Sequence, residues 1–241
     1  MVASPLGSPA VNSPMNHTST ELAGLIRSDS LRMAHSARTS HVGSALSCAD
    51  ILAVLYANVM RHRPSDPKWS DRDRLVMGKG HAAIALYSCL ANTGYFPRDL
   101  LESFGKEGTP LAGHVTAGST PGVEVSSGSL GHGLSQAAGI ALALRNQGST
   151  PRTFCLMSDG DCQEGATWEA AILTGTWGLA NLHAIVDANG QQGLGAVADI
   201  ANLEPLSTKW SAFGWDVQTV DGHDVEALRI ALGRTSSTQP M

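Results

Sequence analysis

The chain has 241 residues, of which 42% are hydrophobic and 15% are charged, and its formal net charge is −5. This length and composition are typical of a globular α/β protein with one large domain or two small ones. The negative charge and the lack of Lys/Arg runs argue against nonspecific nucleic-acid binding. The four cysteines have no metal or redox spacing and indicate reduced thiols in a cytoplasmic protein, and the longest apolar runs are too short to span a bilayer.

The first part of the chain predicts a polar tail, three helices and a strand. Residues 1–19 are rich in Ser, Pro and Asn and lack the apolar stretch of a signal peptide, so we expect a flexible tail there. A helix with a Ser or Thr cap follows, with apolar residues at helical spacing up to Ala34. Residues 47–60 predict a second helix, for which Ser47 is the candidate cap. A short strand over 74–77 and a helix over 82–94, ended by a glycine, complete this part.

The rest of the chain alternates strands with helices. A glycine-dense loop precedes a helix of small residues that ends at Gly148, strands are expected at 152–159, 181–190 and 213–222, and helices at 166–178 and 224–233. This alternation implies crossover units and an α/β fold of three layers, with a mostly parallel sheet between helices on both faces. No linker divides the chain, so we expect one domain over residues 20–233 and a short C-terminal tail over 234–241.

Polar motifs follow two of the predicted strands, SDG at 158–160 and DANGQ at 187–191. One strand–helix–strand crossover has about this length, and it would bring Asp159 and Asn189 into one crevice at the carboxyl edge of the sheet. Together with the main-chain oxygen of Gln191, these oxygens suit a hard cation such as Mg²⁺, which also binds phosphate oxygens. Gly160 has no side chain, so the backbone there can approach a bound diphosphate closely. The alternative is that each motif is only a turn, because Asp, Asn and Gly dominate turns. Their occurrence at two strand ends one crossover apart favours the binding site.

The pattern Asp-Gly, Glu-Gly, Trp-Glu-Ala and Asp-x-Asn over residues 159–189 resembles the thiamine diphosphate motif of transketolases. Four more segments resemble that family in the same order, namely 37–56, 73–95, 113–143 and 214–228. The likeness is greatest to the short N-terminal subunits of split transketolases. It implies the diphosphate-binding (PP) module of the thiamine diphosphate-binding fold, with Mg²⁺, Ca²⁺ or Mn²⁺ beside the cofactor.

The resemblance also assigns roles to residues. The metal ligands would be Asp159, Asn189 and the main chain of Gln191. Cofactor contacts would come from a histidine, a loop and the strand ends, namely His81, Gly128, Ser129, Leu130, Ser158, Gly160, Asp161 and Asn189. The catalytic set would comprise three active-site histidines and two glutamates of a proton relay at a partner interface, namely His41, His81, His114, Glu164 and Glu169. The alternative for the acidic residues is a favourable charge at a helix N-terminus, which suffices for Asp161.

The chain departs from the full-length enzymes at three positions of these motifs. They usually have Pro where Ser129 stands and Gly where Ser158 stands, and often Gln in place of His132, whose role the resemblance leaves open. At the end of the chain, RTSSTQPM replaces a Pro-Thr strand and a later histidine of the family. One strand and one active-site histidine are therefore expected to be missing.

The resemblance further implies a partner. In the family a glutamate on a pyrimidine-binding domain promotes carbanion formation on the cofactor, and no part of this sequence could form that domain. We therefore expect a separately encoded pyrimidine-binding subunit, in an α2β2 assembly. The expected reaction is transfer of a two-carbon ketol unit between sugar phosphates, which the histidines favour. The alternatives are acyloin formation from an α-keto acid and a non-catalytic, cofactor-binding homologue.

Overall fold

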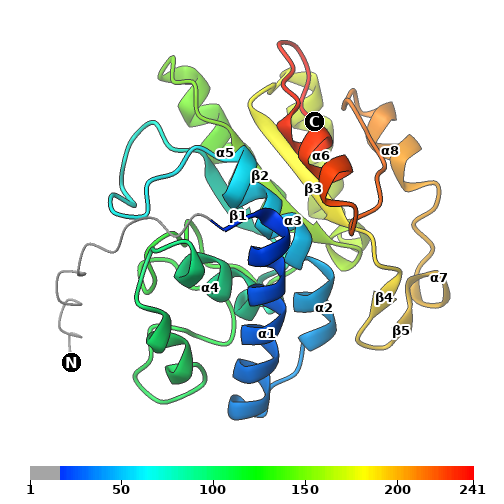
Figure 1. Cartoon of the computed structure of the whole chain (residues 1–241). Helices are drawn as coiled ribbons and strands as arrows, with labels where there is room; N and C mark the ends of the chain where they lie inside the picture. Colours follow the sequence, from blue (N-terminus) through cyan, green and yellow to red (C-terminus); the bar gives the residue numbers. More distant parts are fainter. Residues whose placement is uncertain (1–16) are drawn as a thin grey trace.

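A parallel sheet between two layers of helices forms the computed structural model, which describes residues 17–241 (Figure 1). Most of the tail expected over residues 1–19 lies outside the described residues. The sheet has the order β1 (Arg74–Met77), β2 (Thr153–Ser158) and β3 (Leu182–Asp187). The other elements are α1 (Ser19–Ala37), α2 (Val42–Ser47), α3 (Ala49–Val54), a π-helical turn (Leu55–Val59), α4 (Ala83–Asn92), α5 (Gly133–Asn146), α6 (Gly165–Thr176), β4 (Gln191–Gln192), β5 (Gly195–Ala196), α7 (Val197–Ile200), α8 (Leu206–Ala212), α9 (Val225–Gly233), and 3₁₀ turns at Gly80–Ala82, Arg98–Ser103 and Gly160–Gln163. No helix within 17–241 is both long and apolar enough to cross a membrane.

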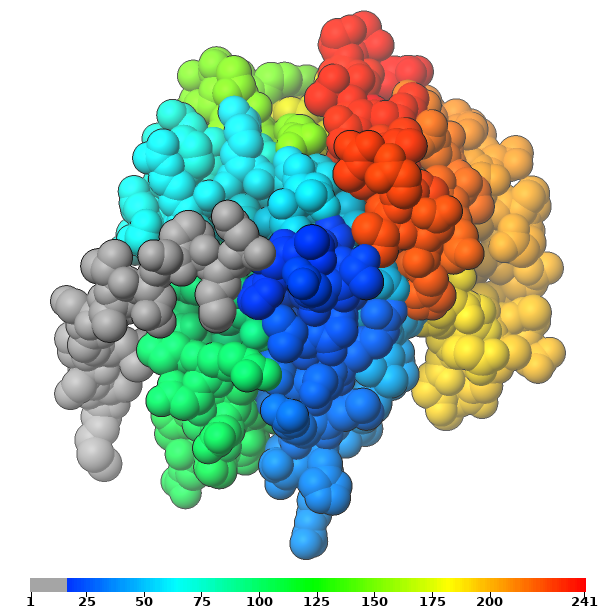
Figure 2. Space-filling view, in the orientation of Figure 1, coloured from blue at the N-terminus to red at the C-terminus, as the bar shows by residue number. Residues whose placement is uncertain are grey.

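Helices cover both faces of the sheet, as the sequence predicts. Successive strand residues point to opposite faces, so Met77 and Leu156 pack against the layer of α1, α3, α4 and α9, whereas Val76 and Met157 pack against the layer of α5 and α6. Because both faces are buried, the strands are apolar almost throughout. In Figure 1 α1 and α3 lie in front of the strands, and in Figure 2 the C-terminal segment in red and orange-red covers the upper part of the same face.

The β2–α6–β3 crossover places the two polar motifs next to each other. All three strands are parallel, and β2 pairs with β3 in a register that sets Ser158 opposite Asp187. The turns that follow these two residues therefore leave the same edge of the sheet at neighbouring positions. This edge is where ligands bind in open α/β sheets.

The first helix has the predicted cap, but the second has a different N-cap residue from the one predicted. The Thr18 hydroxyl accepts a hydrogen bond from the Glu21 amide, and the Glu21 carboxylate accepts one from the Thr18 amide. The two bonds make a complete capping box. The helix expected over 47–60 is confirmed as α3 and the π-helical turn that continues it to Val59. The sequence reasoning missed the short helix α2, which precedes it and ends at Ser47. Ser47 does not cap α3, because its hydroxyl bonds instead to Asp187, far along the chain.

The strand expected over residues 213–222 is also wrong. The segment is extended but belongs to neither sheet. Trp215 packs into the core, and its indole N–H donates to the Ala171 carbonyl oxygen (3.0 Å), so a side chain and not a ladder holds the segment in place. The Asp216 amide donates to the Pro240 carbonyl oxygen (3.0 Å).

The last residues of the chain lie along the edge of β3. The Met241 amide donates to the Leu182 carbonyl oxygen (3.1 Å), and the Ala184 amide donates to the Met241 carbonyl oxygen (2.6 Å). This is one rung of parallel pairing on the free edge of the sheet. The residues expected to form a short tail thus contact the sheet at the position next to β3.

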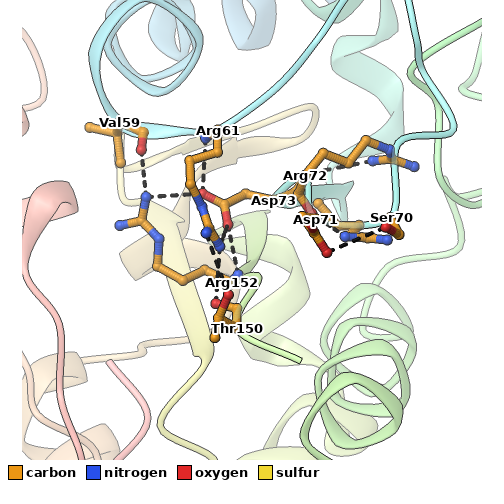
Figure 3. Close-up of polar contacts among 9 residues, drawn as sticks. Val59, Arg61, Ser70, Asp71, Arg72, Asp73, Thr150 and Arg152 are labelled. Atoms are coloured by element: carbon orange, nitrogen blue, oxygen red, sulfur yellow. Dashed lines mark hydrogen bonds and ion pairs between the residues drawn. The ribbon is translucent and has the colours of Figure 1, made fainter. Parts of the chain in front are cut away.

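An ion-pair cluster lies at the amino ends of the strands, where β1 and β2 begin (Figure 3). Asp73 is almost completely buried and pairs with Arg61 (3.1 Å) and Arg152 (3.0 Å), and it also accepts hydrogen bonds from both of their backbone amides. Burial would raise the pKa of Asp73, but these hydrogen bonds and the Arg152 charge outweigh it and hold the pKa below its usual value. The cluster stabilises the amino ends of the strands, whereas the polar motifs lie at their carboxyl ends.

Candidate functional site

Asp159 follows β2 and contacts the turn that follows β3. Its side chain is 4% exposed, and the Gly190 amide donates to its Oδ2 atom (3.0 Å). Burial raises the pKa of the Asp159 carboxyl above its usual value, the Gly190 amide opposes this shift, and the neighbouring Asp187 adds to it. The two strand ends therefore converge as the crossover argument predicts, and a buried carboxylate at this point is short of positive charge.

The turn after β3 presents its oxygens at the surface. Asn189 and Gln191 are exposed, and the Gln191 amide donates to Asn189 Oδ1 (2.9 Å). Among residues 17–241 no cluster of three or more His, Cys, Asp and Glu side chains has the arrangement of a metal site. The predicted donor set has one carboxylate, one amide oxygen and one main-chain oxygen. Such an all-oxygen set suits Mg²⁺, Ca²⁺ or Mn²⁺ with a diphosphate, and not a metal that prefers thiolate or imidazole ligands.

A glycine-rich loop lies directly over the Asp159–Gly160 turn. A Cβ atom on Gly160 would lie 2.9 Å from Leu130 Cδ1, so only glycine lets Leu130 pack there without displacement. The Gly131 amide donates to Asp161 Oδ1 (2.9 Å), and the Ser158 amide and hydroxyl donate to Asp161 Oδ2 (2.8 and 2.9 Å). Asp161 is completely buried. Its carboxylate thus joins the loop to the strand end.

Two more glycines let this loop approach its neighbours. Gly128 has φ +130°, and a Cβ atom there would lie 2.6 Å from His114 Cδ2. A Cβ atom on Gly80 would lie 2.6 Å from the carbonyl carbon of Ser127. The loop that carries Ser129, which is exposed, is therefore packed between the end of β1 and the His114 segment.

Three histidines from three distant segments form one cluster. The ring centroid of His41 lies 5.3 Å from that of His81 and 5.9 Å from that of His114. His41 is held at φ 71°, a left-handed backbone conformation that non-glycine residues seldom adopt, which often marks a functional site. Burial and, to a smaller extent, the charge of Lys79 lower the pKa of His81 to about 4. Burial also lowers the pKa of His41. Neutral imidazoles at neutral pH can accept protons or bind hydroxyl groups.

Acid should weaken the fold through the buried imidazole of His81. In the unfolded chain His81 takes up a proton near pH 6.5, but in the folded chain only near pH 4. Between these values the unfolded state binds more protons, so stability falls as pH falls through this window. We expect His81→Asn to flatten the fall of the urea midpoint between pH 6.5 and 4. A midpoint profile parallel to that of the unsubstituted chain would contradict the assignment.

The two glutamates of the predicted relay lie at the surface. Glu164 is the N-cap position of α6, Glu169 lies one turn further along, and both are exposed. A Cβ atom on Gly131 would lie 2.4 Å from Glu164 Cβ, so the start of α6 also packs against the glycine-rich loop. His132 is exposed, and its Nδ1 atom lies 3.2 Å from the Leu130 carbonyl oxygen.

Sequence reasoning missed two charged residues beneath this site. Lys79 is completely buried and forms an ion pair with Asp187, which is 7% exposed. The available signals were a lysine between two glycines just before His81 and an aspartate at the last position of a buried strand. Neither signal names a partner, because 108 residues separate the pair.

The fold and this site define a thiamine diphosphate-binding module, and comparisons with known proteins agree. Residues 18–240 match the family model described as transketolase, thiamine diphosphate binding domain. The chain is 40% identical over 217 residues to a 6-deoxy-6-sulfo-D-fructose transketolase subunit of Clostridium sp., covering 90% of this chain and 79% of that one. It is 40% identical over 198 residues to an apulose-4-phosphate transketolase subunit of Phocaeicola vulgatus, covering 82% and 70%.

A solved structure gives the same result. Transketolase from Campylobacter jejuni superposes with a TM-score of 0.86 at 34% identity, over 92% of this chain and 36% of that one. The chain belongs to the transketolase family, and the resemblance inferred from its motifs is confirmed. It spans about a third of that full-length enzyme and most of the length of the two shorter subunits.

Proposed function

We propose that this chain is the N-terminal subunit of a two-component, thiamine diphosphate-dependent transketolase. With a pyrimidine-binding partner it would transfer a two-carbon ketol unit between sugar phosphates. The observation that carries the proposal is the convergence of the Asp159 carboxylate with the turn at Asn189 and Gly190, beneath a loop that packs on Gly160. This supplies oxygen ligands, backbone amides and a close approach of backbone to one point, which are the requirements of a metal–diphosphate group.

Each residue of the site has a proposed task. Asp159, Asn189 and the Gln191 main chain hold Mg²⁺, while His81, Ser158 and Gly160 contact the diphosphate. Gly128, Ser129 and Leu130 would touch the aminopyrimidine side of the cofactor. The cofactor itself supplies the carbon nucleophile that carries the two-carbon unit. The chain binds and orients it, and keeps water away from it.

The histidine cluster supports a sugar substrate. His41, His81 and His114 form a polar cluster that can bind hydroxyl groups and hold a proton at a ring nitrogen. Two of the similar proteins are named for a sulfo-sugar and a sugar phosphate. The substrate proposed here is accordingly a ketose phosphate as donor and an aldose phosphate as acceptor.

A partner subunit would cover the exposed face of α6. Beyond Glu164 and Glu169 this face carries three exposed large apolar side chains, Ile172 (47%), Leu173 (45%) and Trp177 (40%). Exposed apolar groups that lie together mark interaction sites, and a partner that covers them would also desolvate the two carboxylates. We propose an α2β2 assembly in the cytoplasm, and the four cysteines, all buried and unpaired, fit a reducing compartment.

Leu173→Arg should separate the subunits without unfolding the chain. The side chain is half-exposed, so the melting temperature of the isolated chain should change little, whereas burying an unpaired charge at the interface should weaken association about 10-fold or more. Analytical ultracentrifugation of the two purified subunits measures this. Leu31→Arg is the matched control, because Leu31 is 50% exposed on α1, in the other helix layer. Equal association of both variants with the partner would remove the α6 face from the proposed interface.

Reconstitution tests the proposed reaction. The purified chain alone should give no ketol transfer, and the chain mixed with a pyrimidine-binding subunit, Mg²⁺ and thiamine diphosphate should give it. Measurable transfer by the single chain would contradict the two-component proposal. Acyloin formation from an α-keto acid, without transfer between sugar phosphates, would contradict the substrate class.

A further inference from the structure

Lys79 is a completely buried lysine directly behind the site. Lysine is almost never fully buried unless it is paired, and exchange of a buried ion pair for apolar residues often leaves stability unchanged or improved. Lys79 pairs with Asp187 Oδ2, and its Nζ atom also donates to the Ser44 carbonyl oxygen (3.2 Å). The pair occupies one oxygen of Asp187 and leaves the other free to bond elsewhere.

The second oxygen of Asp187 leads to the turn after β3. The Ser47 hydroxyl donates to Asp187 Oδ1 (2.7 Å), and the Asn189 amide nitrogen, Nδ2, donates to the same Ser47 oxygen (3.3 Å). The chain of contacts thus runs from Lys79 through Asp187 and Ser47 to Asn189. Its members come from α2, the turn after β1, and β3 with the turn that follows it.

The direction of each hydrogen bond determines the next. Asp187 is an acceptor only, so the Ser47 hydroxyl must give its proton to Asp187 and turn its lone pairs to Asn189. Lone pairs attract the Nδ2 side of the amide and repel the Oδ1 side. Oδ1 therefore faces the other way, where the Gln191 amide donates to it (2.9 Å). Two independent bonds thus agree on the orientation of this amide.

We propose that Lys79, Asp187 and Ser47 are positioning residues that hold the Asn189 amide with its oxygen toward the metal ion. The inference rests on the proposed function, since only an oxygen can bind the cation. Lys79 also neutralises the charge of Asp187. Asp159 is then the single unpaired charge of the proposed metal site, and Asp187 is not free to become a ligand. Outer partners of this kind typically change metal affinity by 10- to 100-fold.

Ser47→Ala tests the relay at its central member. We expect the Kd for Mn²⁺, measured by electron paramagnetic resonance with the reconstituted complex and thiamine diphosphate, to rise about 10- to 100-fold. The melting temperature should stay close to that of the unsubstituted chain, because a half-buried hydroxyl is lost and no charge is left unpaired. In the reconstituted enzyme the half-saturating Mg²⁺ concentration should rise while kcat at saturating Mg²⁺ changes little. Ser36→Ala, on the exposed side of α1, is the matched control.

A double-mutant cycle separates orientation from a general loosening of the site. In Asn189→Asp both terminal atoms are oxygens, so orientation no longer matters, and adding Ser47→Ala should change the Mn²⁺ Kd less than about 3-fold. An equal loss in both backgrounds, or no loss in either, would overturn the inference while leaving the proposed function intact. Failure of the unsubstituted complex to bind Mn²⁺ with thiamine diphosphate would overturn the proposed function as well.

Discussion

Ketol transfer by the reconstituted enzyme should fall by at least about 100-fold when Asp159 is replaced by alanine. The loss should exceed that caused by removing a residue that only supports a metal ligand, because Asp159 is itself a proposed ligand. Asp159 is the only carboxylate in the proposed ligand set, and alanine also removes the acceptor of the Gly190 amide. Binding of Mn²⁺ together with thiamine diphosphate should be lost in parallel.

The folded chain should tolerate this change well. Burial raises the pKa of Asp159, which means that the fold pays for keeping this charge out of water beside Asp187. Without metal, Asp159→Ala should therefore melt at the same temperature as the unsubstituted chain or higher, as is common when a functional charge is removed. The matched control is Asp199→Ala, in which an exposed carboxylate of α7 is removed. Undiminished turnover in Asp159→Ala would remove Asp159 from the metal site.

Gly175→Ala should destabilise the chain by about 3 kcal/mol, at the upper end of the usual range for overpacking. Gly175 lies on α6 where the segment after α8 crosses it, and a Cβ atom there would lie 1.9 Å from the Phe213 carbonyl oxygen and 3.1 Å from its carbon. Because the obstacle is backbone, no rotation of a side chain can relieve the clash. The segment that carries Trp215 must then move away from α6.

A second helix glycine provides the control of opposite sign. Gly139 lies within α5, is exposed, and has no heavy atom within 4 Å of an added Cβ. Gly139→Ala should stabilise the chain by about 0.5–1 kcal/mol, because alanine loses less conformational freedom than glycine in a helix. Urea unfolding of both variants measures the difference. Similar midpoints for the two would show that the Gly175 contact does not limit the packing of α6.

Local patterns were enough to predict the sheet and the place of the site. Apolar runs that end in SDG and DANGQ indicated β2 and β3, and the length of one crossover implied that their ends are neighbours. The pattern failed over 213–222, where a similar apolar alternation forms no strand. The residues there are held by the Trp215 indole and by Gly175, and neither contact has a signature in the local sequence.

The sequence by itself determined the layers, the edge at which the polar motifs emerge and, through family motifs, the class of ligand. Tertiary structure alone decided which polar group faces which. Asp161 was predicted to contact the cofactor or to favour a helix N-terminus, and its carboxylate bonds to Ser158 and Gly131. Lys79 and Asp187 form an ion pair across 108 residues. The physical reason is that secondary structure and burial follow from periodicity over a few residues. A hydrogen bond depends on the distance and direction between two groups, and only the packed chain determines these.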